Sequence, residues 1–139
     1  MTPLLKVIES RDCAMFAKFL SKQLMDTISF FDYKEDYYHG FLAGILKCFH
    51  KYAVYSNREA GEGRSDLILK DYEVGDVGII IEIKVADKFS EMEKECDEAL
   101  KQIETMQYEH DLLEEGYQEI IKYGVCFFKK RCMVKVLEK

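Results

Sequence analysis

The sequence predicts an α/β fold in which helices flank a central mixed β-sheet. Two segments in the amino-terminal half carry apolar residues at three- and four-residue steps, which is typical of amphipathic helices. The period then changes: Val77 to Val85 is almost continuously apolar, as expected of a central strand buried on both faces. A further helical segment separates three strands from two later ones, and this order is typical of layered α/β domains.

Local patterns place the individual elements. Phe16, Leu20 and Leu24 recur on one helical face, and Cys96 and Ile103 belong to another. Glycines at 61 and 63 indicate a loop, and Lys129, Lys130 and Arg131 indicate a hairpin turn between the last two strands. The sequence predicts helices at 12–28, 35–51 and 87–108, a break at 29–34, strands at 52–56, 65–70, 77–85, 119–128 and 132–137, and a loop at 57–64.

Composition favours one domain over residues 1–139, with an amino-terminal helix at about 12–28 and a core at about 35–139. The single proline, Pro3, marks no internal boundary, and no repeat is present. The five cysteines show no C-x-x-C spacing, so neither a disulfide framework nor a zinc site is expected. No apolar run approaches the roughly 20 residues of a membrane span, and no signal sequence is evident. We therefore expect a cytoplasmic protein without a membrane partner.

The net charge of −6 argues against a protein that grips nucleic acid mainly through phosphate contacts, because such domains are usually basic. It leaves room for an enzyme that uses bound divalent cations against a phosphodiester. The basic residues 129–131 could contact a phosphate backbone, but three such residues in a turn are more often only a solvated hairpin.

Two charged side chains interrupt the most apolar strand. Glu82 and Lys84 lie two residues apart and therefore point to the same face of the sheet. In the strand before, Asp66 interrupts a similar apolar alternation. If these strands are antiparallel neighbours, Asp66 and Glu82 converge. Two carboxylates, a nearby backbone carbonyl such as that of Ile83, and waters would form the oxygen shell that Mg²⁺ or Mn²⁺ prefers.

Lys84 would then face the bound phosphate or the attacking water, where an ammonium stabilises developing negative charge. A structural alternative stays open on spacing alone: Glu82 and Lys84 form an ion pair, and Asp66 caps a loop. Ionised groups in an apolar strand are costly unless they are paired or bind a metal. Either reading therefore requires a compensating partner.

Asp66, followed by Glu82, Ile83 and Lys84 on the next strand, resembles the motif of the PD-(D/E)XK nuclease superfamily, with Ser65 in place of the motif's proline. More specifically, the chain is similar to the nuclease-like domain found behind an AAA-ATPase-like domain in bacterial proteins. The matching stretches are 38–44 (YHGFLAG), 56–66 (SNREAGEGRSD), 80–84 (IIEIK), 99–103 (ALKQI) and 123–127 (YGVCF).

The resemblance implies a restriction-endonuclease-like three-layer α/β/α fold and a metal-dependent nuclease acting on nucleic acid, DNA rather than RNA. Asp66 and Glu82 would be the metal ligands and Lys84 the catalytic lysine. It also implies that an AAA-ATPase-like domain lies outside this chain, since no G-x-x-x-x-G-K-[ST] motif is present. A homodimer is a further expectation, because many such folds dimerise to cut two strands.

Several other residues are candidates for the same site. By the resemblance, Glu35 supplies an additional acid for the metal, and Gln102 and Tyr108 reach toward the site. His39 shares a helical face with Glu35, four residues away. Arginine suits bidentate phosphate contact, so the loop before Asp66 adds substrate-binding candidates. These are Arg58, Glu59 and Arg64.

Each supporting residue has a structural alternative: a helix cap for Glu35, a hydrogen-bonded core-edge histidine, an Arg–Glu surface pair and a solvent-facing amide. Two functional alternatives to the nuclease also stay open. One is an inactive module that keeps the fold to bind nucleic acid or a protein partner. The other is a purely structural domain in which the carboxylates are merely paired.

Overall fold

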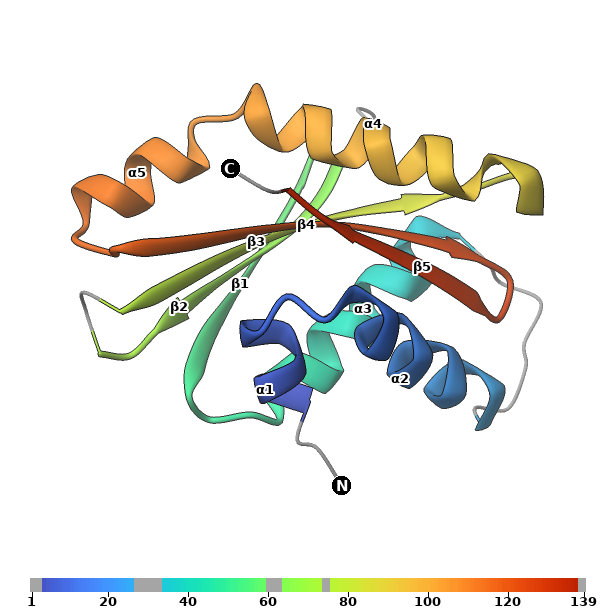
Figure 1. The fold of residues 1–139 in the computed structure, drawn as a ribbon, viewed down its shortest axis with the longest axis horizontal. Helices are drawn as coiled ribbons and strands as arrows, with labels where there is room; N and C mark the ends of the chain where they lie inside the picture. The colour runs from blue at the N-terminus through green and yellow to red at the C-terminus, as the bar shows by residue number, and fades with distance from the viewer. Residues whose placement is uncertain (1–3, 27–33, 60–63, 74–75, 138–139) are drawn as a thin grey trace.

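The computed structural model describes residues 4–26, 34–59, 64–73 and 76–137, with only the backbone described at 57–59 and 64–65. It contains a five-stranded mixed sheet with helices on both faces (Figure 1), which is the predicted α/β restriction-endonuclease-like architecture. The elements are α1 (Leu4–Glu9), α2 (Cys13–Asp26), α3 (Glu35–Lys47), β1 (Tyr52–Glu59), β2 (Arg64–Asp71), β3 (Val77–Val85), the 3₁₀ helix η1 (Phe89–Glu91), α4 (Met92–Glu104), α5 (Tyr108–Glu114), β4 (Glu119–Phe128) and β5 (Arg131–Val136).

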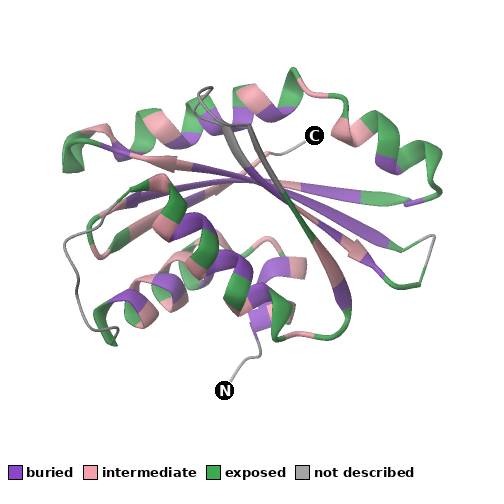
Figure 2. Cartoon of the chain, turned by 180° about the vertical axis from the view of Figure 1, so that it is seen from behind, coloured by how far each residue is buried: buried purple, intermediate pink, exposed green. Residues whose placement is uncertain are grey.

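The strands lie side by side in chain order, β1-β2-β3-β4-β5. β3 is antiparallel to β2 and parallel to β4, and the remaining neighbours are antiparallel. The parallel β3–β4 pair requires a crossover, and α4 and α5 supply it. β3 lies at the centre, with its first seven residues fully buried (Figure 2), as its apolar sequence predicted.

The two faces of the sheet carry different cores. Helices α1, α2 and α3 cover one face, where Leu20 and Leu42 pack with Ile81 and Tyr123. Helices α4 and α5 cover the other face (Figure 1). There Leu100, Ile103 and Leu112 surround Ile80 of β3 and Ile120 of β4. Because neighbouring residues of a strand alternate between faces, each charged residue of β3 is assigned to a layer by its position.

The helix predicted over 87–108 corresponds to η1 and α4, which begin at Phe89 and end at Glu104. The chain then bends and forms α5 from Tyr108 to Glu114, a helix that was not predicted. At the bend, Thr105 donates from its hydroxyl to the Gln102 carbonyl at 2.8 Å, and its own N–H bonds the same oxygen. The bend allows Leu112 to pack in the buried cluster around Ile80. Burial of the Leu112 side chain stabilises the bent arrangement.

Other boundaries also differ from the prediction. α3 ends at Lys47 rather than at residue 51, and α1 was not predicted. β1 continues to Glu59 and β2 begins at Arg64, so Arg58, Glu59 and Arg64 belong to strands rather than to a loop. The hairpin turn is confirmed and comprises Lys129 and Lys130, while Arg131 opens β5. The predicted helix end at Ile28, the break at 29–33 and the glycines at 61 and 63 lie outside the described residues.

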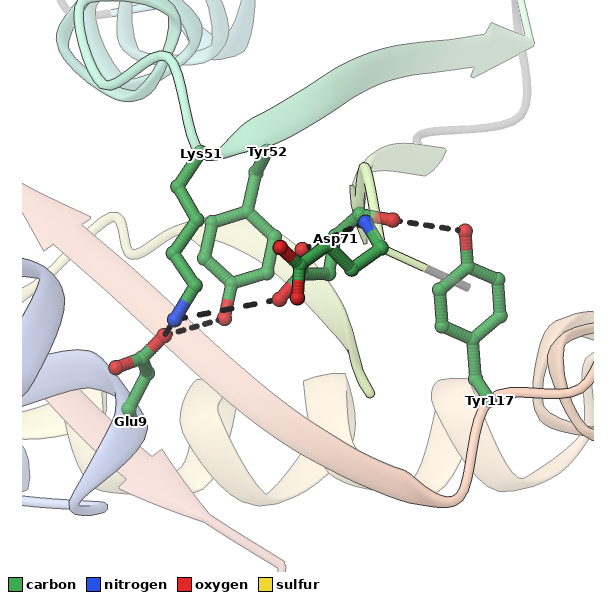
Figure 3. Close-up of polar contacts among 6 residues, drawn as sticks. Glu9, Lys51, Tyr52, Asp71 and Tyr117 are labelled. Carbon is green, nitrogen blue, oxygen red and sulfur yellow. Dashed lines mark hydrogen bonds and ion pairs between the residues drawn. The ribbon is translucent and has the colours of Figure 1, made fainter. Parts of the chain in front are cut away.

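The amino-terminal helices are tied to the sheet by polar contacts. Glu9 of α1 accepts hydrogen bonds from Lys51 Nζ at 2.7 Å and from the Tyr52 hydroxyl at 2.6 Å (Figure 3). The Tyr123 hydroxyl of β4 donates to the Ile8 carbonyl at 2.6 Å. At the same end of the sheet, the Tyr117 hydroxyl donates to the Asp71 carbonyl at 3.2 Å (Figure 3).

None of the helices in the described ranges is long and apolar enough to cross a membrane.

Candidate active site

Asp66 and Glu82 are direct partners across the β2–β3 ladder. Both are buried, with 1% and 0% of their surface exposed. Residues directly opposite in an antiparallel pair share a face and have Cβ atoms about 4.5–5.5 Å apart. Ile80 lies two residues before Glu82 and packs under α4 and α5, so both carboxylates belong to that layer. The antiparallel arrangement on which their convergence depended is therefore present.

Two carboxylates at this separation repel each other. With an effective dielectric constant of about 20, unit charges about 5 Å apart repel by about 3 kcal/mol, in addition to the cost of burial. The Tyr108 hydroxyl donates to Asp66 Oδ2 at 3.1 Å. Asp66 Oδ1 is buried and accepts no hydrogen bond from any described residue. A buried oxygen in this state suits a cation, and the residues present therefore fit Mg²⁺ or Mn²⁺, which prefer oxygen ligands.

Two carboxylates, those of Asp66 and Glu82, are the acidic ligands that the described part of this site offers to a metal. Among the described residues, no group of three or more His, Cys, Asp or Glu side chains is arranged to bind a metal. Mg²⁺ commonly keeps several waters and needs only one or two protein carboxylates, so a pair is a sufficient anchor. The β2–β3 pairing ends at Asp66 and Glu82, and Ile83 follows the last pair.

Lys84 shares the face of Glu82 two residues further along β3, about 7 Å away along the strand. Its side chain is half-buried. None of the ion pairs within the described part of the chain includes Lys84. Among the described residues, which include both Glu82 and Lys84, the ion pair between these two side chains that was considered as an alternative does not form. Lys84 is more exposed than the buried Asp66 and Glu82.

His39 contacts the sheet on the face opposite the two carboxylates. The buried ring is hydrogen-bonded through Nε2 to Ser56 Oγ of β1. The register partner of Ser56 is Leu67, so this contact belongs to the face opposite Asp66. Burial lowers the pKa of His39 below 6.5, the negative charge of Asp66 opposes that shift, and Lys47 adds to it. The ring is therefore neutral at pH 7 and positions Ser56 without adding charge.

The remaining candidates are placed to different degrees. Glu35 is half-buried in the first turn of α3 and is not grouped with the two buried acids in a three-residue site within the described ranges. Arg58 pairs with Ser65 in the β1–β2 ladder, and Glu59 pairs with Arg64. These strand positions lie next to Asp66. The side chains of Arg58, Glu59 and Arg64 are outside the described residues.

Gln102 and Tyr108 both come from the layer that covers the carboxylates. Tyr108 opens α5 and reaches Asp66, as described above. Gln102 lies near the end of α4, and its amide oxygen Oε1 is buried without a hydrogen bond from the described residues. A buried amide oxygen normally has a partner, which makes a water or a bound group at this position a reasonable expectation.

Gly124, a residue to which the sequence analysis assigned no role, lies opposite Glu82 in the parallel β3–β4 pair. A Cβ there would lie 2.7 Å from the Cys96 carbonyl of α4 and 3.1 Å from Ala99 Cβ. The missing side chain thus lets α4 approach the sheet directly above Glu82. A glycine inside an otherwise apolar strand is a known sign of close backbone approach, so the signal was present in the sequence.

A family model of the PD-(D/E)XK nuclease superfamily matches residues 33–136, which is most of the chain. The chain belongs to this superfamily. Searches among curated proteins and among solved structures gave no match. Proteins of the PD-(D/E)XK nuclease superfamily act on nucleic acid, so nucleic acid is the partner that family membership implies. The match begins after α2, yet α1 and α2 pack on the same sheet as the PD-(D/E)XK core.

Proposed function

We propose that this protein is a divalent-metal-dependent nuclease that hydrolyses phosphodiester bonds, in DNA rather than in RNA. The observation that carries the proposal is the pairing of two buried carboxylates, Asp66 and Glu82, across two central strands. Superfamily membership supports the reaction class. The Asp66 oxygen without a hydrogen bond from the described residues supports a cation as the compensating partner.

In this proposal Asp66 and Glu82 hold Mg²⁺ or Mn²⁺, and the backbone carbonyl of Ile83 completes the protein's share of the ligands. A bound divalent cation lowers the pKa of a coordinated water and neutralises charge on the phosphate. Lys84, on the same face, donates to the non-bridging phosphate oxygen on which negative charge develops. Tyr108 fixes the carboxylate of Asp66 through its hydroxyl.

Other residues complete the proposed site. Glu35 is a further acid that a second metal or a metal-bound water would contact. Gln102 offers its buried amide oxygen from above the carboxylates. Arg58 and Arg64 would hold phosphates beside Asp66, with Glu59 orienting them. His39 would position β1 through its hydrogen bond with Ser56, on the opposite face of the sheet.

We further propose that residues 1–139 act as one structural unit, because the contacts of Glu9 and Ile8 join the amino-terminal helices to the sheet. A cytoplasmic location is a separate proposal. A homodimer and an AAA-ATPase-like domain outside this chain remain proposals that rest on the resemblance alone.

The decisive experiment measures cleavage of single-stranded, duplex and branched DNA and of RNA, with Mg²⁺, Mn²⁺ or EDTA. We expect metal-dependent products from the wild type. Lys84→Ala should lose about 10²–10³-fold in rate, because one donor to the developing charge is removed. Lys88→Ala is the matched control, since Lys88 is an exposed lysine shortly after β3. Equal cleavage by wild type and Lys84→Ala would contradict the proposal.

The second candidate is an inactive PD-(D/E)XK module that binds nucleic acid or a protein partner. The net charge of −6 favours it, since an acidic protein repels a polyanion. Isothermal titration with Mn²⁺ separates the two functions. Metal binding by the wild type that is lost in Asp66→Asn supports the nuclease, whereas no metal binding together with no cleavage supports the inactive module.

A further inference from the structure

A small cleft of about 260 Å³ adjoins the carboxylate pair on the same face of the sheet. Tyr108, whose hydroxyl bonds Asp66, forms the wall between the two. Ile68 lies in the cleft two residues after Asp66 on β2, which places it about 7 Å from Asp66 on the same face. The remaining lining residues are Tyr55, Lys70, Asp111, Leu112 and Glu115.

The cleft has an aromatic side chain available for stacking. Tyr55 of β1 is the register partner of Ile68, and 52% of its surface is exposed. The Lys70 ammonium lies 4.9 Å from the centre of the Tyr55 ring and 2.8 Å from Glu115 Oε1. These contacts restrain the side chain, which stays exposed at the surface. An exposed tyrosine beside Ile68 and buried Leu112 provides a flat apolar platform.

The charges at the cleft favour a base over a phosphate. Asp111 and Glu115 of the α5 region are both exposed at its rim. Lys70 is already engaged by Glu115. Carboxylates repel phosphate but accept hydrogen bonds from the exocyclic amines of bases, as an acidic side chain does with the amino group of cytosine. The rim thus suits a neutral ring that carries an amino group.

The size and position of the cleft agree with this chemistry. A volume of about 260 Å³ is smaller than the roughly 300–1,000 Å³ of ordinary ligand pockets, so it accommodates one flat ring system and no base pair. Ile68 lies about 7 Å from Asp66, which corresponds to about two nucleotide steps at about 3.4 Å for each stacked base. A base held there belongs to a nucleotide within two steps of the phosphate at the carboxylates.

We propose that this cleft binds one unpaired, amine-bearing nucleobase of the substrate strand, stacked on Tyr55 and within two nucleotide steps of the scissile phosphate. This deepens the proposed nuclease function, on which it rests, and it specifies the substrate as a single strand or an unpaired end. Recognition through a base also accounts for how a protein with a net charge of −6 selects nucleic acid. Base–aromatic stacking contributes about 1–3 kcal/mol per base, and this contribution does not depend on the net charge of the protein.

The test measures binding without cleavage, in EDTA, by the fluorescence of single-stranded oligonucleotides that contain 2-aminopurine. The wild type should change the fluorescence on binding. Tyr55→Ala should weaken binding by about 5- to 150-fold, and Tyr55→Phe should retain both affinity and signal because it keeps the ring. Tyr72→Ala is the matched control, since Tyr72 is 67% exposed and lines no part of the cleft. Circular dichroism verifies that each variant is folded.

A second set of binding measurements varies the base in the oligonucleotide and compares single strands with duplex. Oligonucleotides with cytosine or adenine should bind the wild type more tightly than oligothymidine, and blunt duplex should bind more weakly than either. The preference for single strand over blunt duplex should disappear in Tyr55→Ala, because stacking on the ring requires an unpaired base, whereas the preference for cytosine or adenine depends on the rim carboxylates of Asp111 and Glu115. Unchanged binding by Tyr55→Ala, or no binding by the wild type, would overturn the proposed subsite. Tyr55-dependent binding without cleavage in any metal would instead overturn the nuclease proposal and leave the subsite intact.

Discussion

At the scale of single residues, the site is recognisable because charged side chains stand where burial makes them expensive. Asp66 and Glu82 interrupt apolar strands, and the structure pairs them across the ladder. Tyr108 was proposed as a polar contact, and its hydroxyl reaches Asp66. Gly124 was overlooked, although a glycine inside an apolar strand is itself a sign of close backbone approach. Which element approaches, here α4, is a tertiary property that the strand alone does not give.

The buried acid pair leads to a prediction about stability. Asp66→Asn removes one of two opposed carboxylates, so it should stabilise the metal-free protein by about 1–2 kcal/mol. This corresponds to roughly 3–10 °C in Tm for a protein of this size. The wild type should gain about 2.7 kcal/mol when Mn²⁺ is present at 100 times its Kd, and the variant should gain nothing.

Thermal unfolding with EDTA and with Mn²⁺ measures both effects. Asp87→Asn is the control, because Asp87 is exposed and follows the same strand as Glu82. A metal-free Asp66→Asn protein that melts below the wild type would show that the carboxylate is already compensated within the protein.

At the scale of elements, the periodicity of apolar residues identified most helices and strands. The residues at which these elements begin, end or bend depend on contacts between elements. α3 and β3 begin where the sequence places them, and β4 has its predicted bounds. The predicted helix ended about four residues beyond α4, and α5 was not predicted. At seven residues, α5 is too short for a clear helical period. The break is stabilised by Leu112 packing against Ile80, a contact between elements.

The α4–β4 contact at Gly124 gives the prediction at this scale. Gly124→Ala places a methyl group 2.7 Å from the Cys96 carbonyl, which must force α4 away from the sheet. We expect a loss of about 1–3 kcal/mol in the free energy of unfolding and weaker metal binding, since Glu82 lies opposite. Urea denaturation and Mn²⁺ titration measure the two effects.

Gly44→Ala provides the control for that experiment, because a Cβ at Gly44 would meet nothing within 4 Å. It lies inside α3, where alanine is favoured over glycine, so a gain of about 0.4–1 kcal/mol is expected. If both variants lose stability equally, close packing at Gly124 is not the reason for its glycine.

At the scale of the whole molecule, α1 and α2 join the sheet although the family match begins at residue 33. The network around Glu9 connects them to the start of β1 (Figure 3). Burial alone would raise the pKa of Glu9, but the hydrogen bonds from Lys51 and Tyr52 outweigh burial and leave that pKa below 4.5. The ionised carboxylate therefore stabilises the fold at neutral pH.

Because the pKa of Glu9 is lower in the folded state, its contribution is complete above about pH 4.5 and is lost as the pH falls through the folded value. Glu9→Gln should therefore lower stability by about 1–2 kcal/mol at pH 7, and this difference should shrink progressively as the pH falls below 4.5. Thermal unfolding at pH 7 and at a series of lower pH values measures it. Glu98→Gln, at an exposed pair with Lys101, should change little at any of these pH values. A difference that stays constant as the pH falls would assign the effect to lost packing.

The sequence alone determined the fold class and the central strand, and it predicted the two acids with their lysine as the site, because alternation and burial cost are local properties of a strand. Only the tertiary structure decided that Asp66 faces Glu82, that α4 and α5 are separate helices, and that Tyr108 and Tyr55 border one cleft. These facts depend on strand register and on packing between distant segments. No local period encodes either, because both are set by the contacts that the whole chain makes at once.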